Sequence, residues 1–181
     1  MARRKRPWLS RTLLVAALLP FPALAGCGYR LTTSMPALTR HIRIIAVPPF
    51  VNHTRIPRLS QMITAAVVRE LIARTQARVR ARTSGSDAVL RASLLLTRTT
   101  PVSIDPSTGR ATTIQVLLEM SASFTDERTG RALFNSQHMI FQDQYQVGEQ
   151  TASFIEEDTL AYQRMSTEIA HDLVSRILNR F

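Results

Sequence analysis

Residues 113–124 alternate between polar and apolar side chains, with one exception at Leu117, and this pattern constrains the fold more than any other in the chain. Successive side chains of a β-strand point to opposite faces, so a period of two collects the apolar residues on one face. That face consists of Ile114, Val116, Leu118, Met120, Ala122 and Phe124. The segment is therefore predicted to be a strand with one buried face and one open face.

Other segments have the composition or the period of strands. The candidates are residues 42–47, 77–82, 88–97 and 133–145. In the third of these, one row of apolar side chains is formed by Ala88, Leu90, Ala92, Leu94 and Leu96. Turn-forming residues at 105–109 and 126–130 are expected to join the last three strands into an antiparallel meander.

Two segments have the period of amphipathic helices. The first is expected from about Arg58 to Thr75, with an apolar stripe of Leu59, Met62, Ile63, Ala66, Val67 and Leu71. The second closes the chain, with an apolar stripe of Tyr162, Met165, Ile169, Leu173 and Ile177. Its acidic start at Glu156, Glu157 and Asp158 and its basic end at Arg176 and Arg180 suit the helix dipole.

These elements predict an α/β (α+β) two-layer sandwich. A sheet with a single apolar face buries that face against helices, and two amphipathic helices supply the second layer. We expect a mixed sheet of about four to five strands that contains the antiparallel meander and is packed by the two helices.

The N-terminus has the features of a bacterial lipoprotein signal. A basic segment and a Leu- and Ala-rich stretch at residues 12–24 precede small residues and then Cys27, the only cysteine of the chain. Cleavage before Cys27 leaves a thiol that accepts diacylglycerol and an amino group that accepts a further acyl chain. The apolar stretch is shorter than the roughly 20 residues of a spanning helix, and Pro20 and Pro22 interrupt it. We expect a signal peptide at 1–26, a lipidated tether at 27–40 and one domain at 41–181.

Export changes the meaning of the positive charge. Five of the 23 basic residues lie in the signal peptide and all 13 acidic residues lie beyond it, so the net charge falls from +10 to +5 on cleavage. An exported protein meets lipid phosphates rather than nucleic acid, so we expect no nucleic-acid partner.

Motifs for catalysis or metal binding are missing from the sequence. The four histidines lack the spacing of metal ligands, no G-x-S-x-G motif surrounds a serine, and no glycine-rich phosphate loop occurs. We therefore expect no enzymatic activity, no catalytic residues, no metal and no cofactor beyond the covalent lipid on Cys27. A periplasmic enzyme whose site assembles only in space stays as a remote alternative.

Arg78, Arg80 and Arg82 form the sharpest candidate for binding. In a strand these alternate residues share one face, where they can form charge-assisted, bidentate hydrogen bonds with phosphates. The alternative is a solvated face, or an edge strand whose charges discourage aggregation.

Several short segments together resemble the LptE family of lipopolysaccharide-assembly lipoproteins. They are Cys27-Gly28-Tyr29-Arg30-Leu31, residues 41–50, Asp87-Ala88-Val89-Leu90, Pro101-Val102-Ser103, Thr129-Gly130-Arg131 and residues 173–178. The resemblance implies a sheet packed by two helices and a lipid on Cys27. It also implies a non-catalytic protein of the outer membrane that binds lipopolysaccharide and assembles with an LptD-type β-barrel to deliver it to the outer leaflet.

A second resemblance leaves an alternative open. Residues 45–50 also look like the opening strand of CsgG-like and penicillin-binding-protein-activator lipoproteins, which implies a periplasmic interaction module. Gly28, which follows Cys27, differs from the aspartate of inner-membrane retention signals and suits sorting to the outer membrane.

Overall fold

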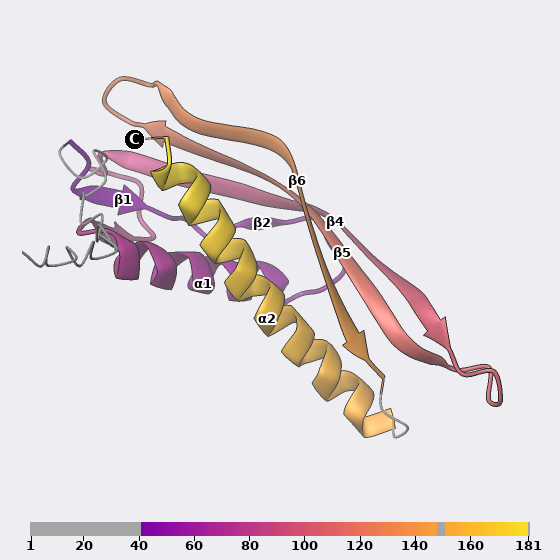
Figure 1. Ribbon diagram of the computed structural model, residues 1–181. Helices are drawn as coiled ribbons and strands as arrows, with labels where there is room; N and C mark the ends of the chain where they lie inside the picture. Colours follow the sequence, from indigo (N-terminus) through magenta and orange to yellow (C-terminus); the bar gives the residue numbers. More distant parts are fainter. Residues whose placement is uncertain (1–40, 148–150, 181) are drawn as a thin grey trace, which may run out of the picture. The chain divides into compact units, whose positions relative to one another are not determined.

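A mixed β-sheet of six strands, covered on one face by two helices, is formed by residues 41–147 and 151–180, the part of the chain that the computed structural model describes (Figure 1). The strands are β1 (Ile44–Ala46), β2 (Val51–Asn52), β3 (Arg78–Arg80), β4 (Ala88–Ile104), β5 (Ala111–Asp126) and β6 (Ala132–Gln146). The helices are α1 (Leu59–Arg74) and α2 (Thr151–Leu178). Cys27 and the tether lie outside the described residues.

The strand order is β3-β1-β4-β5-β6, and β2 pairs with β4 beyond the end of β1. β1 is parallel to both β3 and β4, whereas β4, β5 and β6 form an antiparallel meander. Parallel strands need a long crossover, which α1 supplies between β1 and β3. The two-layer prediction is confirmed, and the additional strand is β2, whose two residues are too few to produce a sequence pattern.

Both predicted turns are present at the ends of the meander. Gly109 and Gly130 have φ values of 68° and 67°, which only glycine adopts readily. Asp105 accepts a hydrogen bond from the amide of Ser107 at 2.7 Å, and Asp126 accepts one from the amide of Arg128 at 2.8 Å. Each turn thus combines an aspartate that accepts backbone hydrogen bonds with a glycine in the left-handed region.

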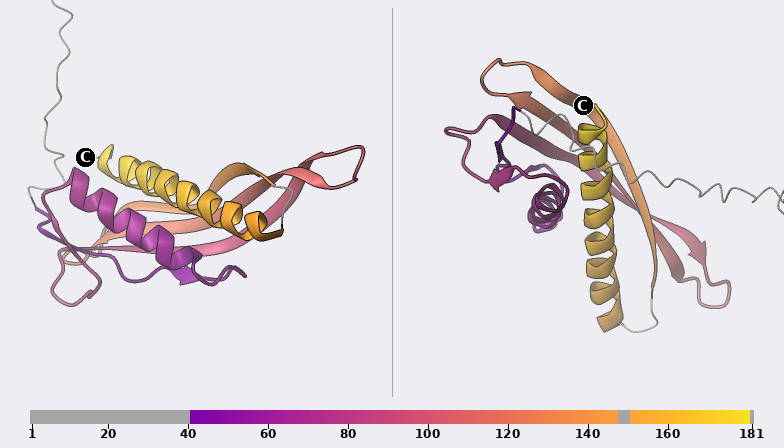
Figure 2. Two further views of the ribbon diagram at one scale, coloured as in Figure 1. Left: turned by 90° about the horizontal axis from the view of Figure 1, so that it is seen from below. Right: turned by 60° about the vertical axis from the view of Figure 1, so that its left-hand side comes forward.

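The core lies between the helices and one face of the sheet. Figure 2 shows α1 and α2 over the same face. The apolar residues predicted for that face of β5 are all buried, with exposures of at most 8%, and the predicted stripes of both helices are buried except for partly buried Met62. Burying each large side chain contributes about 1.5–3 kcal/mol before the entropy cost of ordering is subtracted.

A β-bulge in β4 corrects one predicted core position. Leu94 pairs with Met120 but Leu96 pairs with Glu119, so Leu95 is an extra residue in the ladder. Because the extra residue reverses the alternation, Leu96 points to the uncovered face, where it is 43% exposed. The prediction that Leu96 belongs to the buried row is wrong.

The start of α2 also differs from the prediction. The helix begins at Thr151, so Glu156, Glu157 and Asp158 follow its first turn instead of forming it. The side chains of residues 151–158 lie outside the described part of the structure. At the other end Arg176 occupies the last turn, as expected.

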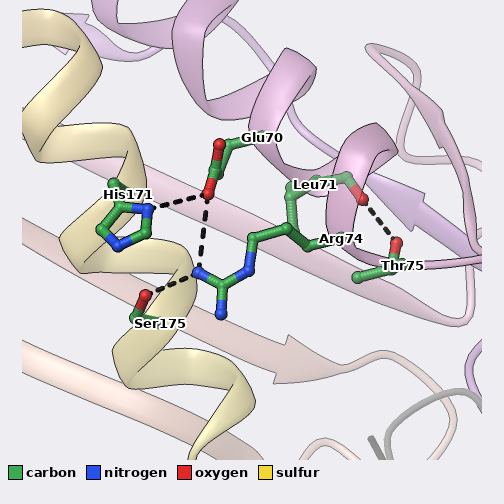
Figure 3. Close-up of polar contacts among 6 residues, drawn as sticks. All are labelled: Glu70, Leu71, Arg74, Thr75, His171 and Ser175. Atoms are coloured by element: carbon green, nitrogen blue, oxygen red, sulfur yellow. Dashed lines mark hydrogen bonds and ion pairs between the residues drawn. The ribbon is translucent and has the colours of Figure 1, made fainter. Parts of the chain in front are cut away.

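A polar cluster joins the two helices at the surface (Figure 3). The Oε1 atom of Glu70 lies 3.5 Å from Arg74 Nη1 and 3.1 Å from His171 Nδ1. Arg74 also donates to the hydroxyl of Ser175 at 2.6 Å. Exposed pairs of this kind each contribute roughly 0–1 kcal/mol, so the buried stripes, not this cluster, hold α1 against α2. Among the described residues, neither helix is sufficiently long and apolar to cross a bilayer.

The buried face of β5 gives a direct test of this packing. Phe124→Ala removes a side chain that is 1% exposed, and we expect the free energy of unfolding to fall by about 3–5 kcal/mol. Ile140→Ala is the control, because Ile140 is 59% exposed on the uncovered face and its loss should cost less than about 0.5 kcal/mol. Urea unfolding of both variants measures the difference, and equal losses would contradict the assignment of the two faces.

Candidate binding surfaces

Only two of the three arginines predicted to share one strand face, Arg78 and Arg80, do so in the structure. β3 lies at the edge of the sheet, and Arg78 and Arg80 pair with Ile44 and Ala46 of β1. Val79 between them packs against the core, so both arginines point to the face that the helices leave open. Strand β3 ends at Arg80, so Arg82 lies beyond the strand and is not a member of the row.

Arg80 holds the loop that follows it. Its Nη2 donates to the carbonyl oxygen of Ser84 at 2.5 Å, and the Ser86 hydroxyl donates to the carbonyl of Thr83 at 2.6 Å within the same loop. Gly85 has a φ of 73°, and a Cβ at this position would lie 3.3 Å from Arg80 Nη2. Arg80 therefore has a structural contact, whereas Arg78 and Arg82 are exposed and have no ion pair within the described ranges.

The uncovered face of the meander is the larger surface. Cross-strand partners place its side chains in rows, for example Arg91, Ser123 and Asn135, and Thr100, Gln115 and Gln144. Hydroxyl and amide groups predominate, and charged groups are few. A shallow hollow of about 180 Å³ in this face is lined by Arg91, Ser93, Ser121, Ser123, Asn135 and Gln137.

The chemistry of this hollow is that of a hydrogen-bonding surface. Serine hydroxyls and amide groups donate and accept, and Arg91, which is 3.4 Å from Glu127, provides one guanidinium group. Such groups can bind sugar hydroxyls, phosphates or a polar protein wall. Sequence reasoning missed the hollow because three strands contribute to it; its only local signal is the serine pair Ser121 and Ser123 on β5.

Next to the hollow, the same face has a small apolar area with an embedded acid. Leu96 and Ile140 lie on either side of Glu119 in one cross-strand row. Glu119 Oε1 lies 2.6 Å from Nδ1 of His138. Two features create this row, namely the bulge at Leu95 and a register shift in β6 between Ser136 and Met139.

The described residues contain no group of three or more histidine, cysteine, aspartate or glutamate side chains placed to hold a metal ion. The paired acids and histidines that are present lie at the surface, at Glu70 with His171 and at Glu119 with His138.

The sequence matches the model of one protein family. The family described as "LptE: Lipopolysaccharide-assembly" matches residues 42–177, from two residues before β1 to the last turn of α2. A search of the curated proteins finds no match to this sequence.

Solved structures share the fold at low sequence identity. A putative lipoprotein from Caulobacter crescentus is 11% identical, with a TM-score of 0.51 over 75% of this chain and 88% of that protein. The rare lipoprotein B from Shewanella oneidensis is 13% identical, with a TM-score of 0.50 over 74% of this chain and 92% of that protein. Lipoprotein B from Nitrosomonas europaea is 13% identical, with a TM-score of 0.50 over 76% of this chain and 86% of that protein.

The different roles of the two strand arginines can be separated by stability. Arg80→Ala removes the hydrogen bond to Ser84, so we expect the free energy of unfolding to fall by about 1–2 kcal/mol and trypsin to cleave faster after Arg82. Arg78→Ala removes an exposed side chain, and its effect should stay below about 0.5 kcal/mol. Urea unfolding and timed proteolysis test this, and identical behaviour of the two variants would contradict the structural role of Arg80.

Proposed function

The chain belongs to the LptE lipopolysaccharide-assembly family, and on this premise we propose that it is a non-catalytic outer-membrane lipoprotein that assembles with an LptD-type β-barrel, binds lipopolysaccharide and assists its insertion into the outer leaflet. The observation that carries the proposal is the family match over residues 42–177, which includes all six strands, all of α1 and all of α2 except its last residue. The domain faces the periplasm or lies within the lumen of the barrel.

The uncovered sheet face supports the partnership with a barrel. The interior walls of outer-membrane barrels are polar, and a surface that docks inside one must exchange hydrogen bonds with such a wall. The rows of serine, threonine, asparagine and glutamine on β4, β5 and β6 provide these groups with little net charge. We infer that this face lies against the barrel, with Leu96 and Ile140 filling apolar positions between the polar contacts.

The arginines at the other edge of the sheet are proposed to contact lipopolysaccharide. Arg78 and Arg82 are exposed, and their guanidinium groups can bind phosphate through two parallel hydrogen bonds. Arg80 is the third member of the proposed contact, and it acts mainly by holding the loop from which Arg82 projects. Bound phosphates would thereby lose their contacts with neighbouring lipopolysaccharide molecules.

Membrane attachment is proposed to depend on Cys27. One acyl chain gives only marginal binding to a bilayer, whereas two or three hold a protein there stably. Diacylglycerol on the thiol and an acyl group on the new N-terminus supply that number. The chain is thus a lipid-anchored protein whose covalent lipid is its only prosthetic group.

Affinity purification tests the partnership. We expect the full chain, extracted from membranes in mild detergent after labelling with a fatty-acid probe, to carry the label and to retain an LptD-type barrel, because the polar sheet face and the anchor both favour the complex. Cys27→Ala is the control for labelling. Recovery of a peptidoglycan synthase or a secretion pore in place of the barrel would favour the alternative class of interaction lipoprotein. An unlabelled, cytosolic protein would overturn the proposal.

Lipopolysaccharide binding tests the arginines. We expect the double variant Arg78→Ala and Arg82→Ala to bind lipopolysaccharide at least about tenfold more weakly, because two charge-assisted phosphate contacts are lost. Arg80 is kept so that its loop stays in place. The matched control is Arg58→Ala and Arg69→Ala, which removes two exposed arginines from the start and the outer side of α1. Fluorescence titration with labelled lipopolysaccharide measures the affinity, and unchanged binding of the double variant would exclude this face.

A further inference from the structure

One end of the sheet collects exposed arginines from four separate segments. β1 and β3 begin there, and the pairing of Ala88 with both Ile45 and Asp126 places the β5–β6 turn at the same end (Figure 1). The C-terminus of α2 also reaches it, since Arg180 lies 5.5 Å from the ring centre of Phe134 in β6. We call this surface the basic end; its members are Arg43, Arg78, Arg128, Arg131 and Arg180.

The two aspartates at the basic end accept hydrogen bonds from backbone amides. Asp87 Oδ2 accepts hydrogen bonds from the amides of Arg43 at 2.8 Å and Ile44 at 2.9 Å. Asp126 Oδ1 accepts from the amides of Arg128 at 2.8 Å and Thr129 at 3.1 Å. These oxygens therefore stabilise a strand start and a turn instead of pairing with guanidinium groups.

Asp87 remains ionised in this setting. The amide of Arg43 and then that of Ile44 lower its pKa from the ordinary value of 3.8, and the guanidinium groups of Arg128 and Arg43 act in the same direction. The amide of Glu127, the residue before Arg128, donates to the carbonyl oxygen of Asp87 at 2.9 Å, so Arg43 and Arg128 both lie beside Asp87. Neither guanidinium group forms an ion pair with it within 4 Å.

The result is an excess of free cations. Within the described ranges, none of the five arginines of the basic end forms an ion pair. Asp87 and Asp126 offset two of the five charges, and the Glu127 charge is matched by Arg91 at 3.4 Å. A formal charge of about +3 is thereby concentrated on one end of the sheet, where it produces a local positive potential. The hairpin tip at the opposite end contains one arginine, Arg110, and one aspartate, Asp105, so its formal charge is zero.

The basic end is also the end of the sheet at which the described chain begins. The described chain starts at His41, two residues before Arg43, and Cys27 lies fourteen residues before His41 in the sequence. Fourteen residues span at most about 50 Å. An acyl chain on Cys27 therefore keeps this end within about 50 Å of a bilayer and raises the effective concentration of headgroups around it.

We propose that the basic end docks against a bilayer surface containing anionic glycerophospholipids, with Arg43, Arg128 and Arg131 contacting lipid phosphates and carrying most of the attraction. The proposal rests on the anchored lipoprotein of the proposed function. Each arginine close to an anionic bilayer strengthens association about fivefold, so three together strengthen it about a hundredfold. The anchor keeps the chain at the membrane, and the basic end determines which part of the domain faces the headgroups.

Amide hydrogen exchange on the full acylated chain in nanodiscs tests the docking. One set of nanodiscs contains phosphatidylcholine alone, and the other contains phosphatidylglycerol in addition. We expect amides of residues 41–47 and 126–132 to exchange about tenfold more slowly in the anionic nanodiscs at low salt. In 1 M salt the difference should disappear, because the Debye length falls to about 3 Å.

Two matched triple variants identify the surface. Arg43→Gln with Arg128→Gln and Arg131→Gln should abolish the slower exchange while the protein stays anchored. Arg69→Gln with Arg98→Gln and Arg110→Gln removes the same charge from other exposed positions and should retain it. Thermal unfolding verifies that both variants are folded, and Arg78 is left unchanged because it belongs to the proposed lipopolysaccharide contact.

Three other results of the exchange experiment would contradict different parts of the proposal. Anchored protein whose exchange is the same in both lipid compositions would overturn the docking but not the proposed function. Slower exchange only after lipopolysaccharide is added would assign the basic end to that lipid and overturn docking on glycerophospholipid. Protein that does not enter nanodiscs because Cys27 is unmodified would overturn the anchor, and with it the docking.

Discussion

The burial of a single face of β5 is the constraint on which the rest of this structure depends. β5 lies between β4 and β6, so its backbone is hydrogen-bonded on both sides while only one row of its side chains is covered by α1 and α2. Both helices bury their apolar stripes in the same core cluster as that row, and the hydrophobic gain there exceeds anything that the exposed ion pairs contribute. The opposite face is thereby left open along the whole meander.

An open sheet face has to be compatible with water or with a partner, and here hydroxyl and amide groups line it. Side chains of this kind form hydrogen bonds with a polar wall at little desolvation cost, whereas a strongly charged face would require paired charges on the partner. The bulge at Leu95 and the register shift in β6 put Leu96 and Ile140 into this surface, so irregularities of the ladder determine where its apolar contacts lie.

The distribution of charge follows from backbone requirements. Asp87 and Asp126 cap amides where β1 begins and where β5 turns into β6, and this leaves the arginines nearby without acidic partners. Arg80 differs from these arginines. The sequence predicts it as a binding residue, but its guanidinium group donates a hydrogen bond to the carbonyl oxygen of Ser84 and holds the loop after β3. For this reason a count of charges along the chain treats Arg80 as a free cation, which it is not, and gives no sign of the excess of arginines at the basic end.

The sequence by itself determined the local elements. The period of two along β5, the helical periods of both stripes and the turn residues before Gly109 and Gly130 depend on neighbours within a few positions, and all of them appear in the structure. Only the tertiary structure decided the features that join distant segments: the two-residue strand β2, the exposure of Leu96, the contact of Arg80 with Ser84 and the gathering of arginines around Asp87. These features depend on backbone atoms brought together by strand pairing, and no local pattern encodes which carbonyl or amide will lie opposite a given side chain.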